Sequence, residues 1–129
     1  MAKLRRCVAV QNLSNVRVMK TSGELTIDLE DGAVDVVLAH DVLHSYYFSP
    51  PQIATVLAEF HRVLRPGGFL SLYPGDPDAS GDAAQVRQII ETAQEAGFSI
   101  GSEIETRVVH ENSVVPGRLW LFTKTPPVH

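Results

Sequence analysis

Residues 49–73, SPPQIATVLAEFHRVLRPGGFLSLY, decide the fold, because they predict a helix that passes almost directly into a strand. Ser49 is placed to cap the helix, Pro50 suits its first position, and Gln52 completes a capping box. Apolar residues then recur at steps of three and four, which indicates a helix with one buried face. That face comprises Ile53, Val56, Leu57, Phe60, Val63 and Leu64. The helix should end before residues 66–68, and the rest of the stretch should form a strand.

The flanking segments extend this unit into a larger α/β sheet. Upstream, residues 34–39 form a nearly continuous apolar run, which is typical of a strand covered on both faces. This run, the helix and the strand after it predict a parallel β-α-β unit. Downstream, residues 82–97 predict a second helix, capped by Asp82 and ended by Gly97. Two closing strands and the turn between them are predicted at residues 99–109, 119–124 and 112–117.

The amino-terminal third combines a short helix with alternating apolar runs. Residues 4–11 show helical spacing, and the place of Cys7 on the apolar side predicts that it is buried. Residues 16–18 and 25–29 alternate between apolar and polar side chains. They predict a strand and a hairpin.

Composition and charge limit the class of protein. The chain has 129 residues, 44% hydrophobic and 20% charged, which predicts a single domain over residues 1–129. A net charge of -4 without a basic run argues against a nucleic-acid or acidic-membrane partner. No stretch approaches the roughly 20 apolar residues of a membrane helix. The single cysteine cannot form an internal disulfide, so we expect a protein of the reducing cytoplasm.

The charges are distributed unevenly along the chain. Residues 1–20 hold five lysines and arginines and no acid, whereas residues 21–41 hold six acids and no lysine or arginine. Opposite charges of this kind attract one another. The two segments could therefore pair, either within one chain or across two.

Two stretches carry a family resemblance, and a third supports it more weakly. Residues 31–44, DGAVDVVLAHDVLH, resemble the strand that methyltransferases write as DGxFDVV with an LHH-like tail. Residues 61–72, HRVLRPGGFLSL, are close to the RVLKPGG box and its strand, and residues 93–98 match less closely. Because the three stand in the family's order, the chain resembles class I S-adenosylmethionine-dependent methyltransferases, of the type 11-like group.

The resemblance implies a partial Rossmann-like methyltransferase fold, an α/β architecture with a mixed sheet and covering helices. It also implies that the family's first two strands and glycine-rich loop are missing. The nine glycines include no GxG spacing, so no relocated loop is available. We therefore expect S-adenosylmethionine, the family's cofactor, to bind the isolated chain poorly or not at all. Whether the chain is an enzyme stays open.

The resemblance further implies a set of cofactor-side residues. His40 and Asp41 end the 34–39 strand, where the family's cofactor and acceptor meet. Ser22 and Glu24 fall near the family's adenine-binding acid, which Ser22 replaces. His44 could act as a catalytic base, because imidazole titrates near neutrality. Alternatively, these polar residues only form hydrogen bonds with neighbouring loops.

On the acceptor side, the resemblance implies Tyr46, Tyr47, Tyr73 and Asp76 as substrate-binding residues. Aromatic residues that precede a packed helix could instead belong to the core or to an interface. Asp76 and Asp78 share a Pro/Gly loop without a histidine, which favours a solvated turn over a metal site. No metal is predicted.

Without the family's first two strands, the 34–39 strand would lie at the edge of the sheet, where unpaired amides promote association. Residues 16–29 could cover this edge within one chain, or a second copy could pair there; we predict the homodimer. Three functions follow as alternatives. The chain is a methyltransferase completed by another polypeptide, a non-catalytic dimerising or regulatory module for an intact methyltransferase subunit, or a small-molecule binding protein.

Overall fold

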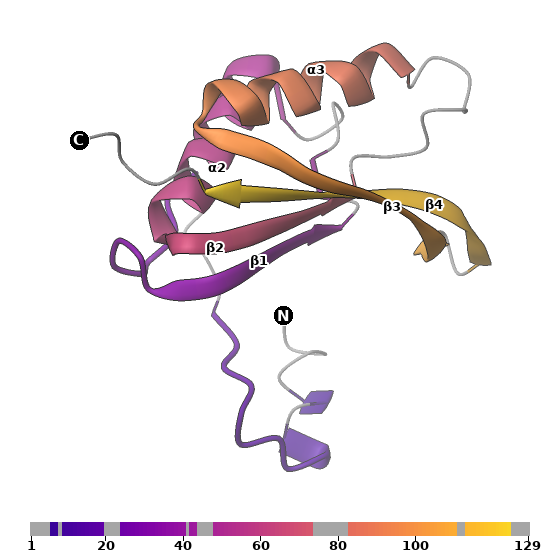
Figure 1. Ribbon diagram of the computed structural model, residues 1–129. Coiled ribbons are helices and arrows are strands. Elements are labelled where there is room, and N and C mark those ends of the chain that lie inside the picture. The colour runs from indigo at the N-terminus through magenta and orange to yellow at the C-terminus, as the bar shows by residue number, and fades with distance from the viewer. Residues whose placement is uncertain are drawn as a thin grey trace.

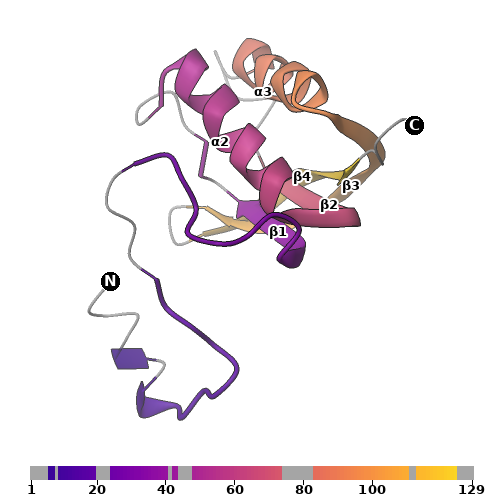
Figure 2. The ribbon, with the colours of Figure 1, turned by 90° about the vertical axis from the view of Figure 1, so that its left-hand side faces the viewer.

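The computed structural model describes residues 6–7, 9–19, 24–40, 42–43, 48–73, 83–110 and 113–124. Within these residues, the elements follow the order β1 (Val34–His40), α2 (Pro50–Val63), β2 (Leu64–Tyr73), α3 (Ala83–Glu95), β3 (Phe98–His110) and β4 (Ser113–Lys124). The strands form one sheet with the order β1-β2-β4-β3, and both helices lie on the same face of it (Figure 1, Figure 2). The predicted α/β architecture, a mixed sheet with covering helices, is confirmed.

Strand directions confirm the predicted β-α-β unit. β1 and β2 are parallel, with Val37 opposite Leu70 and His40 opposite Tyr73. β4 runs antiparallel to both β2 and β3. β1 is therefore an edge strand among the described residues, as predicted. The expectation that both of its faces are covered is wrong, because Leu38 is 68% exposed.

The start of α2 follows the sequence closely. The Ser49 side chain accepts a hydrogen bond from the Gln52 backbone N–H, and the Gln52 side chain accepts one from the Ser49 backbone N–H. This reciprocal pair is the predicted capping box. The end of the helix differs, because β2 begins at Leu64 and not after the glycines. Gly68 allows this early pairing because glycine has no Cβ. A Cβ at this position would lie 2.8 Å from the Asp35 carbonyl oxygen of β1, which is too close.

The core fills the space between the helices and the sheet. Leu57 of α2, Leu70 and Leu72 of β2, and Phe122 of β4 are completely buried. α3 adds Val86, Ile89 and Ala93 to the same cluster, as its apolar spacing predicts. Burial of these side chains removes apolar surface from water and is the main force that joins the helices to the sheet.

Gly97 ends α3 in the left-handed region, with φ 108°. A Cβ at this position would lie 2.7 Å from Nε2 of His61, so glycine also lets α3 approach α2 closely. The His61 ring then packs edge-on against Phe98, with 5.1 Å between ring centroids. The predicted cap, Asp82, lies outside the described residues.

Three predictions for the peripheral segments are wrong. Cys7 is exposed and not buried. The described parts of residues 16–29 contain no strand, so the predicted hairpin is not formed there. Residues 113–117 belong to β4, which pairs with β3 from Phe98 opposite Lys124 to His110 opposite Ser113. The predicted turn at 112–117 is therefore replaced by a longer hairpin.

Candidate functional site

His40 lies at the carboxyl end of β1, next to Tyr73 at the carboxyl end of β2. Ligands of open α/β sheets bind outside these strand ends. The His40 Nε2 lies 2.9 Å from Oγ of Ser71, a hydrogen-bonding distance, and Ser71 is buried. The contact holds an exposed imidazole against the sheet face opposite the helices. His40 is thus fixed in the place that the sequence assigned to it, where it could contact a ligand.

Tyr73 is 2% exposed, so its ring is part of the packed sheet. A Cβ at Gly117 would lie 3.3 Å from Cε2 of Tyr73, which places the ring directly beside the β3–β4 hairpin. The role of Tyr73 in substrate binding stays a prediction.

Glu24 lies on a different surface from that strand end. It lines an open groove of about 270 Å³ between residues 24–27 and α2, with Phe48, Val56 and Phe60 as apolar walls. Glu59 of α2 also lines this groove. Hydrogen bonds from Arg62 and from the Ile27 backbone N–H lower the pKa of Glu59, so its carboxylate stays ionised and forms an ion pair with Arg62.

The other predicted site residues lie outside the described residues. They are Ser22, Asp41, His44, Tyr46, Tyr47 and Asp76. Their roles as cofactor, catalytic or acceptor residues stay predictions. Of the predicted site, the structure therefore brings together His40 and Tyr73 and places Glu24 separately.

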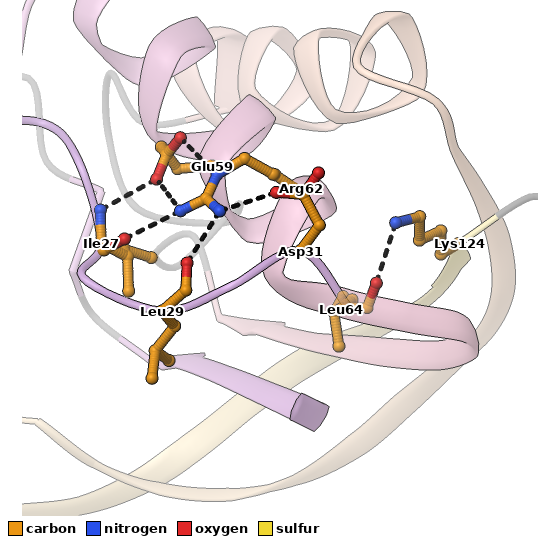
Figure 3. A network of polar contacts seen from close by, with 7 residues as sticks. All are labelled: Ile27, Leu29, Asp31, Glu59, Arg62, Leu64 and Lys124. Carbon is orange, nitrogen blue, oxygen red and sulfur yellow. Dashed lines mark hydrogen bonds and ion pairs between the residues drawn. The ribbon is translucent and has the colours of Figure 1, made fainter. Parts of the chain in front are cut away.

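Arg62 is the main polar anchor that the sequence analysis missed (Figure 3). It binds the acidic segment, a name we use for residues 24–33, which leads into β1. Its guanidinium donates to the carbonyl oxygens of Leu29 and Ile27, both at 2.8 Å. It also donates to Asp31 and Glu59, both at 2.9 Å, and these carboxylates raise the pKa of Arg62. The side chain therefore fastens an irregular segment to α2.

Backbone groups complete this fastening. The Ile27 N–H donates to Oε2 of Glu59 at 2.8 Å, and the Gly32 N–H donates to the carbonyl oxygen of Arg62 at 2.9 Å. Residues that form no strand thus satisfy their backbone polar groups through α2. The available signal was the position of Arg62 in the HRVLRPGG stretch, three residues after Glu59. Its carbonyl partners cannot be read from a side-chain pattern.

A second anchor secures the junction between α2 and β2. Nζ of Lys124 donates to the carbonyl oxygen of Leu64 at 2.8 Å (Figure 3). Leu64 follows the last turn of α2, where carbonyl groups lack helical partners. The last residue of β4 thus supports the point at which the chain enters β2.

The described residues offer no group of three histidine, cysteine or acidic side chains that could hold a metal ion. Nor does any helix within the described ranges have the length and apolar character needed to cross a membrane.

Sequence comparison gives one family match. The family described as "Methyltransferase domain" matches residues 1–72, which include β1, α2 and most of β2. No curated protein matches the chain significantly.

Solved structures with the same fold include several methyltransferases. A SAM-dependent methyltransferase from Methanosarcina mazei is similar over 97% of this chain and 79% of its own, with 13% identity and a TM-score of 0.70. A methyltransferase from Pyrococcus furiosus is similar over 95% of this chain and 56% of its own, with 23% identity and a TM-score of 0.66.

A third structure is the N-methyltransferase NodS from Bradyrhizobium japonicum in complex with S-adenosyl-L-homocysteine. It is similar over 95% of this chain and 61% of its own, with 18% identity and a TM-score of 0.65. The chain thus spans between 56% and 79% of the length of these three proteins.

Proposed function

We propose, from the premise that this chain belongs to the methyltransferase domain family, that its 129 residues provide the acceptor side of an S-adenosylmethionine-dependent site. The chain is a methyltransferase-like protein, as the sequence predicted. On its own, we expect it to hold the cofactor poorly or not at all.

The absence of a glycine-rich loop in the sequence is the observation that carries this proposal. Dinucleotide and nucleoside cofactors bind Rossmann-like folds through a close backbone turn that follows the carboxyl end of a strand. The described glycines with positive φ are Gly32, Gly67 and Gly97. Gly32 precedes β1, Gly67 lies within the first residues of β2, and Gly97 precedes β3. None of the three follows the carboxyl end of a strand.

His40 supports the acceptor-side half of the proposal. Its imidazole is exposed at a strand end and is held by Ser71, so it could contact a ligand without reorganising. Methyl transfer depends strongly on placing the acceptor in line with the donor, because proximity supplies much of the rate. A chain that positions only one reactant would therefore gain little catalytic advantage.

Calorimetric titration of the 129-residue chain with S-adenosylmethionine and S-adenosylhomocysteine tests the proposal. We expect no heat of binding at ligand concentrations up to about 100 µM, which corresponds to an affinity weaker than about -5.5 kcal/mol. A micromolar dissociation constant for either ligand would overturn it. In that case His40→Ala should weaken binding, while Val114→Ala, a change in an exposed residue of β4, should not.

We also propose a reducing compartment such as the cytoplasm for this protein. The support is the single cysteine, Cys7, which cannot form an internal disulfide and is exposed.

A further inference from the structure

β1 is an edge strand that lacks the usual protection against pairing. Among the described residues its only sheet neighbour is β2. Natural edge strands are blunted by proline, lysine, inward-pointing charges or β-bulges. β1 has neither proline nor lysine, and its one acid, Asp35, forms an ion pair with Arg65 at 2.6 Å. Its register with β2 is irregular between Val34 and Val36 and regular from Val36 to His40, so this second part of the edge remains able to accept another strand.

The sheet face beside this edge is apolar and exposed. α2 and α3 cover the opposite face (Figure 2). On the open face, Val36 lies opposite Phe69 of β2 in the strand register, and Leu38 follows two residues later. All three belong to the exposed large hydrophobic residues. We call this set the β1 edge patch.

The chain also contains a segment that buries almost nothing in its own fold. The N-terminal arm, meaning the described residues 6–7 and 9–19, lies apart from the sheet and the helices in both views (Figure 1, Figure 2). Only Val18 in this arm is even partly buried. Four large apolar side chains are exposed along it: Val10, Leu13, Val16 and Met19. Such a segment gains free energy if it finds an apolar surface.

Charge makes the arm and the region around the β1 edge patch complementary. The arm carries two basic residues, Arg6 and Arg17, and no acid, so its charge is positive. The acidic segment beside β1 exposes Glu24, Asp28 and Glu30. An arm that lies along β1 would bring Arg17 towards these carboxylates. Complementary charges of this kind favour one register and one partner over others.

We propose that the N-terminal arm of a second copy pairs with the β1 edge patch, and that the two arms exchange reciprocally in a symmetric dimer. Residues 16–19 add as a short strand beside β1, in which Val16 and Val18 share one face and cover Val36 and Leu38. Strand addition of this type obtains affinity from backbone hydrogen bonds and specificity from alternate side chains. A two-fold axis lets each copy donate one arm and receive one.

The exchanged arm would also lie beside the candidate site. His40 ends the same strand that receives the arm, so a residue of the second copy would border the strand end where a ligand would bind. This inference does not rest on cofactor binding. Failure to bind S-adenosylmethionine and failure to dimerise are separate results.

Light scattering coupled to size exclusion measures the first consequence on the full chain. We expect a particle of twice the 14.1 kDa chain mass at micromolar concentration. Leu38→Lys should raise the dimer dissociation constant roughly 10- to 100-fold, because it places a charge in the apolar contact. Val114→Lys is the matched control, since Val114 is 64% exposed and Leu38 is 68% exposed. It should leave the dissociation constant unchanged.

Disulfide trapping identifies the segment that pairs. In a Cys7→Ser background, one protein carries Val16→Cys and a second carries Val36→Cys. When the two are mixed and oxidised, we expect a disulfide between different chains that disappears when Leu38→Lys is added. Circular dichroism confirms that each variant is folded.

Several outcomes would overturn the inference. A monomer at all concentrations would exclude the second copy, and a dimer that tolerates Leu38→Lys would exclude the β1 edge patch. A single chain carrying both cysteines that cross-links only internally would show that the arm folds back onto its own β1.

Discussion

The α2–β2 unit and the acidic segment before β1 are held in place by different forces. In the first, Leu57 and Leu70 are completely buried, and the local sequence specifies the start of the helix as well as its apolar face. In the second, residues 27–32 form no helix or strand and are held by the side chains of Arg62 and Glu59. Burial organises the one region and a polar network organises the other. Substitutions in the two regions should therefore differ in the size of their effect and in the measurement that detects it.

Leu57→Ala should give the largest effect, because it removes a completely buried side chain from the core. We expect a loss of about 2–5 kcal/mol in the free energy of unfolding, from lost burial and from the cavity that remains. Urea titration followed by circular dichroism measures it. Val114→Ala is the control at an exposed residue of β4 and should cost less than about 0.5 kcal/mol. Equal losses would remove the distinction between core and surface.

Gly68→Ala should have the next largest effect, because it tests the contact between β1 and β2. A Cβ at Gly68 would lie 2.8 Å from the Asp35 carbonyl oxygen and 2.9 Å from that of Arg65, and backbone cannot move aside cheaply. We expect a loss of about 1–3 kcal/mol by the same titration. Gly101→Ala, whose nearest contact would be at 3.3 Å, should cost less. A variant as stable as the unmodified chain would mean that the strands approach less closely.

Arg62→Ala should act locally, on the acidic segment and not on the core. Without the guanidinium, the carbonyl groups of Ile27 and Leu29 lose their donor. Amide hydrogen exchange across residues 27–32 should become roughly tenfold faster, while the amides of β2 keep their protection. Arg65→Ala removes an exposed ion pair and an exposed hydrogen bond to the Pro66 carbonyl oxygen, and it should change neither region. Faster exchange throughout the sheet would show that the polar network also supports the core.

The pH dependence at His61 should be the smallest effect. Burial, followed by the nearby charge of Lys124, lowers the pKa of His61 below its ordinary value. The unfolded chain therefore binds a proton there more readily than the folded chain does. The stability linked to this group is complete above the ordinary histidine pKa of about 6.5, and it is lost as the pH falls towards the lower folded value. Thermal unfolding between pH 7.5 and pH 5.5 measures it, and His61→Phe should flatten the slope. If His61→Phe leaves the slope unchanged, groups other than His61 cause the pH dependence of stability.

The same contrast separates what the sequence could predict from what it could not. The helix start at Ser49, the parallel strands and the neighbouring positions of His40 and Tyr73 were predictable, because capping, apolar spacing and strand direction all act locally or by simple topology. The irregular path of residues 27–32 was not, because its partners are an arginine more than 30 residues away and backbone groups with no side-chain pattern. An alternating run there favoured a strand, and tertiary contacts overrode that preference.

The candidate site and the peripheral segments also differ in how far the sequence could predict them. His40 could be located because it ends an apolar strand. The exposure of Cys7 could not be foreseen, because the apolar side of a short helix is buried only where a surface receives it, and the arm has none within its own fold. The extended β3–β4 hairpin was underestimated because Pro116 and Gly117 favour a turn, whereas the strand register continues through them.

Arg62 binds backbone groups that lie far before it in the sequence. Its hydrogen bonds to the Ile27 and Leu29 carbonyl groups span 35 and 33 residues. During synthesis from the amino terminus, residues 27–32 therefore leave the ribosome well before the side chain that will hold them. They must wait until α2 has emerged and become helical, since only then do Glu59 and Arg62 lie on one surface. The order of translation and the order of docking are thus opposite for this part of the protein, and the acidic segment should be among the last regions to reach its final position.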